Sequence, residues 1–474
     1  MVRYDYQISF VFVFFNNGMK FYIKLIQTSS LTLGLLWLAC TSQAYGQTEG
    51  DAEPSNSRFS GFATLGMVYN SNPDAGIVFS GAQTKPAFQG LSANLDSLLG
   101  LQWDYKLLPT TSVKLQGVVR AGEEFQAKLR MAYVQQALAE DLSVRAGRMR
   151  SPLFFDADTT EIGYANTAIR GPIPLYAGTS ASQIIHIDGV NVQWRKPLYA
   201  FLLTMDGYWG GGQFTHYDVT KVPTSESQIN TNGITNLVLS LTSDHGLIRY
   251  SHANLANYSA SSDQLVKLNQ GMAELSAGLN KSATGYAAFG KTALAQTLRD
   301  KAKQLDAYAN PFNGAQTYDS IGFSTTLADF GVAGEWAWLS SDAVMLGKRE
   351  AYQISVSYKA GNFTPFIAFS SARRVSNRAD ANPLTPTGVP TLARLDTGIT
   401  DISQGLDQMS RLSNITMQGL SLGMRWEVAN NMAAKIQYDI LNTPSSNVPG
   451  AFKVRSFPFD NAVQLLSASL DVVF

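Results

Sequence analysis

The last residues of the chain, 463–474, restrict its fold more than any other stretch. Counted back from the end, alternate positions hold only apolar side chains: Phe474, Val472, Leu470, Ala468 and Leu466. The positions between them are mixed and hold Val473, Asp471, Ser469, Ser467 and Leu465. Successive side chains of a strand point to opposite faces, so this segment predicts a strand with one apolar side. A strand of a soluble sandwich is one interpretation. The other is a membrane β-barrel strand, whose apolar side meets lipid and whose mixed side lines the interior.

The same alternation returns along the chain. Residues 95–107, 352–359, 420–428 and 432–440 each alternate apolar with polar or small side chains, and their charges fall on one face only. One such segment is weak support, but many of about 10 residues each are typical of a transmembrane barrel. The pattern therefore favours the membrane over the soluble interpretation.

The connections between these segments alternate in length. Short, turn-rich ones lie at 108–111, 139–141, 196–198, 243–246, 328–331, 360–362 and 429–431. Long ones lie mostly at 71–94, 150–184, 210–232, 256–316, 341–348, 371–416 and 442–462, and the link at 121–124 is tight. We predict an all-β fold, an antiparallel transmembrane barrel of about 16 strands, because closure leaves no strand edge unpaired in lipid. A β-propeller is the soluble alternative, but the chain shows no blade repeat.

Composition excludes several functions. Charged residues make up 15% of the chain, well below the ~25% of ordinary soluble proteins. Lys plus Arg equals Asp plus Glu, at 36 each, which argues against a nucleic-acid partner. The single cysteine, Cys40, lies in a predicted export signal, so the mature chain offers no disulfide or cysteine metal site. We expect no cofactor.

The N-terminal region has the order of a secretory signal peptide. Lys20 and Lys24 precede an apolar stretch at 31–39, and Ser42-Gln43-Ala44 forms a small-x-small cleavage site. We interpret residues 1–44 as an over-long extension plus signal peptide that truly starts at Met19. A lipidated Cys40 is the alternative. Residues 45–58 then form a flexible periplasmic lead-in, and residues 59–474 form the barrel.

One long connection differs from the others. Residues 263–308 have almost no strand character, and apolar side chains recur at near-helical spacing at Leu294, Leu298, Ala302, Leu305 and Tyr308. We predict that 256–316 is a long, partly helical extracellular loop. Its helix either packs on neighbouring loops or serves as a lid or partner-binding element.

From residue 59 to 474 the chain resembles the general bacterial porin family of Gram-negative bacteria. The resemblance is carried by the strand that ends at Phe474, by the 435–439 strand before it, and by Val144-Arg-Ala-Gly-Arg-Met-Arg-Ser-Pro152 ahead of a long loop. It implies 16 strands, usually a homotrimer, and passive diffusion of small polar solutes. It also implies that the loop after strand five, here 150–184 after 142–149, folds inward as a constriction. The Pro-Glu-Phe tip often seen in that loop is missing, which leaves room for a dedicated substrate.

The charges near this loop predict a pore constriction. On the preceding strands, lumen-facing positions hold Lys114, Arg120, Lys128, Arg130 and Arg145, and the loop carries Asp156, Asp158 and Glu161. Carboxylates placed opposite a basic wall would bias which ions pass, because charges in a narrow water path are weakly screened. We predict that these eight residues line the constriction, with a mild anion preference.

The sequence thus predicts a porin in the cell outer membrane, in contact with lipid and passing small hydrophilic solutes. A substrate-specific channel for small anions or carboxylates is one alternative, and a surface-binding or structural barrel is another. The four histidines show no metal-ligand spacing. Asn254 stands two residues after His252, where a hydrolytic outer-membrane barrel would need a serine, so we expect no enzyme.

Overall fold

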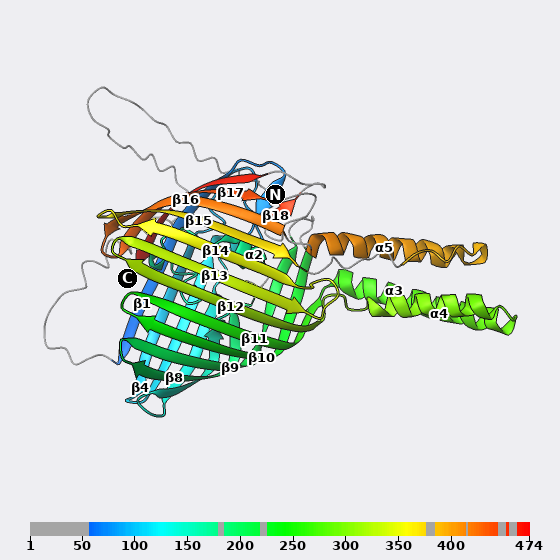
Figure 1. The fold of residues 1–474 in the computed structure, drawn as a ribbon, viewed down its shortest axis with the longest axis horizontal. Helices are drawn as coiled ribbons and strands as arrows, with labels where there is room; N and C mark the ends of the chain where they lie inside the picture. The colour runs from blue at the N-terminus through cyan, green and yellow to red at the C-terminus, as the bar shows by residue number, and fades with distance from the viewer. Residues whose placement is uncertain are drawn as a thin grey trace, which may run out of the picture. The chain divides into compact units, whose positions relative to one another are not determined.

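The computed structural model describes residues 56–178, 184–218, 225–375, 384–413, 416–443, 452–454 and 462–474. Within these ranges, 16 strands form one closed antiparallel β-barrel (Figure 1). They are β1 (Ser57–Asn70), β4 (Leu98–Leu108), β5 (Thr111–Arg120), β6 (Lys128–Ala137), β7 (Leu142–Arg150), β8 (His186–Leu198), β9 (Phe201–Asp218), β10 (Ser225–Ser243), β11 (Gly246–Ser261), β12 (Gly314–Leu327), β13 (Phe330–Ser341), β14 (Arg349–Tyr358), β15 (Phe363–Arg374), β16 (Thr416–Ala429), β17 (Met432–Asn442) and β19 (Val463–Val473).

The barrel closes where the first strand meets the last. β1 pairs with β19 from Phe62 to Asn70, and with β4 from Ser57 to Thr64. Beyond the end of β19, the backbone amide of Gly61 still donates to the carbonyl of Phe474 at 2.7 Å. The predicted fold class is confirmed, and so is its strand count of about 16.

Three short strands lie outside the barrel count. β3 (Gly90–Ser92) pairs with the end of β1, while β2 (Ala75–Ile77) and β18 (Phe452–Val454) form a separate two-stranded sheet. A 3₁₀ turn, η2 (Ala121–Glu123), joins β5 to β6.

Strand alternation sorts the side chains as the sequence predicts. On β19 the outward-facing Leu466 is 48% exposed, whereas the inward-facing Ser467 and Asp471 are each 1% exposed. Neighbouring strands continue the apolar outer surface, and aromatic rings such as Phe59 and Trp103 stack on it with centroids 6.1 Å apart. An apolar outer surface with aromatic rings is what a bilayer-spanning barrel presents to lipid.

One predicted connection is wrong. Residues 210–232 are not a long loop, because most of them belong to β9 and β10. These two strands pair along their length, from Leu202 opposite Thr242 to Asp218 opposite Ser225. The consecutive glycines 210–212 hide the alternation that marks a strand. The register also shifts between Asn232 and Ile234, where Gly233 has a φ of +71°, so the two ends of β10 follow different parities.

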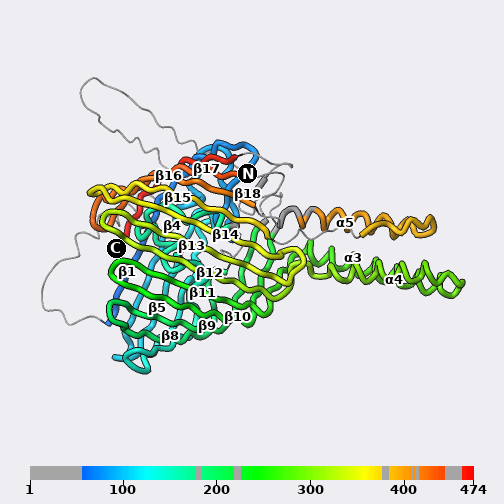
Figure 2. The backbone as a smooth tube through the Cα atoms, viewed as in Figure 1, coloured from blue at the N-terminus to red at the C-terminus, as the bar shows by residue number. Residues whose placement is uncertain are grey.

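Two other long connections contain helices. The β11–β12 connection holds α3 (Asp263–Ala288) and α4 (Thr292–Ala307), and the β15–β16 connection holds α5 (Ala393–Ser413) and the 3₁₀ turn η5 (Pro390–Leu392). The helical spacing at 294–308 corresponds to α4, whereas α5 lies in a segment predicted only as a long connection. Helices α3 and α4 run alongside each other (Figure 2). Side chains from all three helices share one apolar cluster, with Leu279, Leu298 and Leu406 each 0% exposed.

Among the helices in the described ranges, none has both the length and the apolar character required to cross a bilayer. The predicted extension and signal peptide at 1–44, and the lead-in at 45–58 up to residue 55, lie outside the described residues.

Candidate functional site

The loop between β7 and β8 lies against the inner wall of the barrel. We call residues 151–185 the β7–β8 loop; it includes η3 (Gly163–Ala165) and α2 (Ile173–Gly178). Its backbone bonds to inward-facing side chains on distant strands. The Phe155 amide donates to Glu335 Oε1 of β13 at 2.9 Å, and the Ile169 amide donates to Gln437 Oε1 of β17 at 2.8 Å. The loop therefore crosses the barrel interior.

A glycine allows the closest approach of the loop to the wall. A Cβ atom at Gly163 would lie 2.1 Å from Asp471 Oδ1 and 2.5 Å from Thr64 Oγ1, so a larger residue would push the loop away. Lys435 Nζ donates to the Gly163 carbonyl at 2.6 Å while it pairs with Asp471 at 3.0 Å. Position 163 thus brings the loop to the seam between β1 and β19.

A buried arginine anchors the second half of the β7–β8 loop, which we call its far limb. Arg170 donates to both oxygens of Asp96, at 2.9 and 2.6 Å, and to Asp439 Oδ2 at 2.7 Å. Burial would lower the pKa of Arg170, but the two carboxylates outweigh it and raise that pKa. The guanidinium stays charged and joins the loop to two parts of the chain at once.

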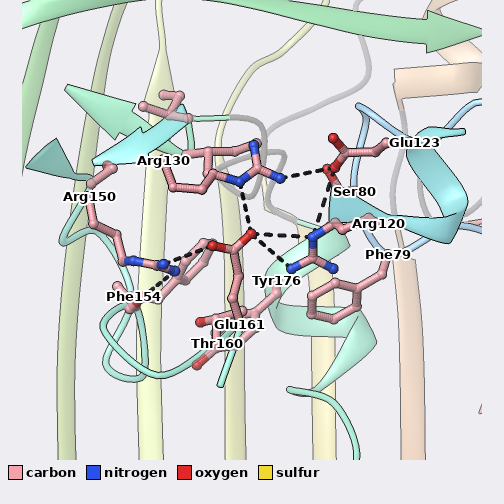
Figure 3. Close-up of a pocket in the computed structure, with 14 residues that line it drawn as sticks. Phe79, Ser80, Arg120, Glu123, Arg130, Arg150, Phe154, Thr160, Glu161 and Tyr176 are labelled. Atoms are coloured by element: carbon pink, nitrogen blue, oxygen red, sulfur yellow. Dashed lines mark hydrogen bonds and ion pairs between the residues drawn. The ribbon is translucent and has the colours of Figure 1, made fainter. Parts of the chain in front are cut away.

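The first half of the loop, which we call its near limb, carries a cluster of charged side chains centred on Glu161 (Figure 3). Glu161 Oε1 accepts from Arg130 Nε at 3.0 Å and from Arg120 Nη2 at 3.0 Å, and Oε2 accepts from Arg150 Nη2 at 2.8 Å. Burial would raise the pKa of Glu161, but the three arginines hold it well below its usual range. A carboxylate that is 4% exposed is therefore kept ionised by its neighbours.

A second carboxylate, Glu123 of η2, extends this cluster. It pairs with Arg130 at 3.1 Å and with Lys128 at 3.0 Å. Burial would raise the pKa of Glu123, but Arg130, Arg120 and Lys128 together lower it. We call Arg120, Glu123, Lys128, Arg130, Arg150 and Glu161 the arginine cluster. Its four bases exceed its two carboxylates, so it carries a surplus of two positive charges.

A cavity of about 70 Å³ borders the arginine cluster. Three bases and two carboxylates of the arginine cluster line it, all except Lys128, and its aromatic lining comes from Phe79, Phe154 and Tyr176. The rings of Phe154 and Tyr176 pack with centroids 4.3 Å apart. The cavity lining thus combines one surplus positive charge with aromatic surface.

Two further carboxyl groups meet behind Tyr176. Its hydroxyl lies 3.2 Å from Asp156 Oδ2 and 3.4 Å from Glu335 Oε2, and it can donate only one hydrogen bond at a time. Burial raises the pKa of Asp156, and it also raises the pKa of Tyr176. This contact differs from the arginine cluster, because no cation pairs directly with either carboxyl group in the described residues.

The structure brings together only some of the predicted constriction residues. Arg120, Lys128, Arg130 and Glu161 meet in the arginine cluster. The other four lie elsewhere. Lys114 pairs with Asp104 at 2.9 Å, Arg145 bonds to Gln135 and Gln193, Asp158 pairs with Arg249 at 3.1 Å, and Asp156 contacts Tyr176. Glu161 also touches the basic wall directly rather than facing it across water.

Sequence reasoning missed several residues of this region. Arg150 stands at the start of the predicted loop, and its side chain turns back to bond with Glu161. Glu123 lies in the tight link at 121–124, where no motif points to a function. Arg170 begins the otherwise apolar segment 170–176, and a lone charge in that segment is the sequence signal that marks it as an anchor. Their partners are far apart in sequence, so local patterns could not identify them.

Comparison with known proteins supports the fold. No family model matches the chain, and no curated protein matches it in sequence. Among solved structures, OmpF of Salmonella typhi in complex with daunomycin is 9% identical, with a TM-score of 0.51 over 88% of this chain and 97% of that one. An anion-selective porin from Comamonas acidovorans is 11% identical, with a TM-score of 0.49 over 89% of this chain and 100% of that one. The resemblance noted in the sequence thus holds at the level of the fold, which is the 16-stranded barrel of porins.

Proposed function

We propose that the chain is an outer-membrane channel that passes small polar solutes and ions by passive diffusion. One observation carries this proposal: a closed barrel has an apolar outer surface, while its inner wall is lined by charged and amide side chains. An apolar exterior suits acyl chains, and a polar interior suits water. The similarity of the fold to porin structures agrees with this function.

The β7–β8 loop is the proposed constriction. Of the eight predicted residues, we assign the narrowest part to the four that meet in the arginine cluster, Arg120, Lys128, Arg130 and Glu161. The other four, Lys114, Arg145, Asp156 and Asp158, are proposed to line the water path on either side of it. Support comes from the loop's bonds to β13 and β17, which hold it across the interior. The charge surplus of the arginine cluster favours anions over cations.

The experiment is conductance of the refolded mature chain in a planar bilayer. Stepwise, ohmic increases in current would support a channel, whereas a membrane-inserted protein without conductance would favour a structural or surface-binding barrel. A reversal potential under a KCl gradient measures selectivity. Anion preference agrees with the arginine cluster at the constriction, and cation preference would contradict that assignment.

A homotrimer is the proposed assembly, and it rests on the resemblance to the porin family. Chemical cross-linking of the detergent-solubilised protein and its mass by light scattering would measure the number of subunits. A strictly monomeric species that still conducts would contradict the trimer and leave the channel proposal intact.

A further inference from the structure

The β7–β8 loop contains an uncharged stretch between two charged anchors. Buried ion pairs fix Glu161 on one side and Arg170 on the other. Between them, residues 162–168 read Ile-Gly-Tyr-Ala-Asn-Thr-Ala and carry no charged side chain. We call this stretch the strap. The side chain of Asn166 donates to the Ile162 carbonyl at 3.2 Å, so the strap is folded on itself.

Two cations of the barrel wall hold the strap by its backbone. Lys435 Nζ of β17 donates to the Gly163 carbonyl at 2.6 Å and to the Ala168 carbonyl at 3.1 Å. Arg425 of β16 donates to two further carbonyls of the strap, at 2.9 Å for that of Asn166. The strap therefore contacts charged wall residues through neutral groups.

The strap also reaches across the length of the barrel. The hydroxyl of Tyr164 donates at 2.6 Å to the carbonyl of Asn430, in the turn that joins β16 to β17. Because neighbouring strands are antiparallel, this turn lies at the opposite end of the barrel from the ends of β7 and β8 that carry the loop. The Tyr164 ring lies over Arg425, with Cζ 4.6 Å from its centroid. The strap is thus latched at the end of the barrel where the short turns lie.

The wall cations keep a carboxylate partner if the strap moves away. Arg425 pairs with Glu427 at 2.9 Å, and Lys435 pairs with Asp471 at 3.0 Å, both within the wall. Water can replace the backbone carbonyls as hydrogen-bond acceptors at a modest cost. Release of Glu161 would instead leave three buried arginines without their shared carboxylate, which is strongly unfavourable. The anchors should therefore hold while the strap lifts.

The strap covers a charged part of the inner wall. Arg425, Lys435 and Asp471 lie on the inner face of the barrel, yet they are only 8%, 4% and 1% exposed. The glycine at position 163 permits this cover, because a Cβ there would lie 2.1 Å from Asp471 Oδ1. Charges of both signs on an inner wall suit water and ions once they are uncovered.

We propose that the strap is a gate, which lifts from β16, β17, β19 and β1 and opens a water path along this wall. The charged lining of that path consists of Arg425, Glu427, Lys435 and Asp471. The inference rests on the proposed channel, because it gives that channel two conductance levels. The lower level belongs to the closed strap and the higher level to the lifted strap.

A disulfide can lock the strap. A Cβ at Gly163 would lie 2.5 Å from Thr64 Oγ1, so cysteines at these two positions bring their sulfur atoms within bonding range. The single cysteine of the chain, Cys40, lies in the predicted export signal, so no native thiol competes in the predicted mature chain. Single-channel current of Thr64→Cys/Gly163→Cys is measured in KCl after oxidation and again after reduction, and mass spectrometry confirms the disulfide.

We expect the oxidised double variant to show the lower level alone and the reduced form to recover the higher level. The single variants cannot form the bond, so neither should respond to the reductant. Thr64→Cys should keep both levels, and Gly163→Cys should favour the higher one, because its side chain crowds Asp471. Equal currents before and after reduction of a confirmed disulfide would overturn the gate and leave the channel intact. No current from the native protein and none from the reduced variant would refute the proposed channel itself.

Tyr164→Phe covers the case in which the double variant does not fold. It keeps the ring over Arg425 and removes the hydroxyl that bonds to Asn430. The ratio of time at the higher level to time at the lower level should rise about fivefold, the equivalent of one hydrogen bond. Tyr133→Phe is the matched control, because Arg145 lies 5.7 Å from that ring and outside the strap, and it should leave the ratio unchanged. The same ratio in Tyr164→Phe and the native protein would overturn the latch.

Glu427→Gln tests the lining of the opened path. It removes a negative charge beside Arg425, so the reversal potential of the higher level should shift towards that of chloride, while the lower level keeps its value. An equal shift at both levels would show that Glu427 lines the water path whether or not the strap is lifted, and it would overturn the proposed lining.

Discussion

Arg130 Nε of β6 lies 3.0 Å from Glu161 Oε1 of the β7–β8 loop. The two side chains are 6% and 4% exposed, so this ion pair is buried. Buried pairs add little stability compared with apolar contacts, but removing one partner leaves an uncompensated charge. The pair therefore holds the loop in one position on the basic wall, and its loss should be costly.

Glu161→Gln tests this anchor. Because three buried arginines lose their shared counter-charge, we expect a loss of about 3–5 kcal/mol in the free energy of unfolding. Heat-dependent migration on gels and urea titration measure it. Asp104→Asn is the control: its pair with Lys114 is about one-third exposed, so its loss should cost only about 0–1 kcal/mol. Equal effects of the two substitutions would contradict a special role for Glu161.

Arg170→Lys tests the second anchor. Lysine keeps the charge but cannot bond to both oxygens of Asp96 and to Asp439 at the same time. We expect lower resistance to urea and greater current noise, because the far limb of the loop is held less firmly. Arg373→Lys, in the more exposed pair with Glu350, should match the native protein. A quiet, fully stable Arg170→Lys channel would refute this role.

The contact among Asp156, Tyr176 and Glu335 predicts a pH dependence. The pKa of Asp156 is raised in the folded protein, so the stabilisation by its protonated form is complete below the ordinary value of about 3.9. That stabilisation is lost as pH rises through the raised pKa. The groups that face Asp156 are Tyr176, Asp158 and Arg249. Glu335 lies on the hydroxyl of Tyr176, as Asp156 does.

Current recordings from acidic to alkaline pH would measure this effect. We expect more frequent conductance fluctuations as pH rises, because the limb at 153–158 loosens. Asp156→Asn should remove much of the dependence. Asp158→Asn should retain it, since Asp158 is largely exposed, at 69% of its side chain, and pairs with Arg249. The idea fails if Asp156→Asn and the native protein respond identically to pH.

Two adjacent positions on β14 test the orientation of the wall. Ile354 faces outward and is 49% exposed, while Ser355 on the inner face is half-buried. Ile354→Lys places a charge in the apolar band and should cost about 2–4 kcal/mol if it lies near the bilayer midplane. Ser355→Lys should be tolerated and change ion selectivity instead. Urea titration of the protein folded into lipid vesicles measures the free energy of unfolding of both variants. A larger loss for Ser355→Lys than for Ile354→Lys would show that the inner and outer faces of β14 are the reverse of those described.

Helices α3, α4 and α5, which we call the helical bundle, should unfold independently of the barrel. Leu298 of α4 is 0% exposed among apolar side chains of the bundle, so Leu298→Ala should destabilise α3 and α4 by about 2–5 kcal/mol. Hydrogen exchange would detect this as lost protection in 263–307, with the barrel strands unchanged. Val266→Ala, at a position that is 45% exposed, is the control. Loss of protection across the strands would show that the bundle and the barrel unfold together.

The sequence by itself determined the barrel, because strand alternation is a local pattern and returns in most of the wall strands. The residues from Leu466 to Phe474 revealed their outer face without any knowledge of their neighbours. Alternation does not reveal the strands at 210–232, because the glycines at 210–212 have no side chains to alternate. It also does not reveal the helix at 393–413, which lies in a predicted long connection.

Only the tertiary structure decided how the interior is organised. Arg170 and Asp439 are 269 positions apart, and Phe155 and Glu335 are 180 apart, yet each pair is joined by a hydrogen bond. The sequence placed Glu161 opposite the basic wall, whereas the path of the loop brings it into contact with three arginines. Which charges meet depends on where the closed barrel places distant strands and on how the loop crosses it, and neither is encoded in local spacing.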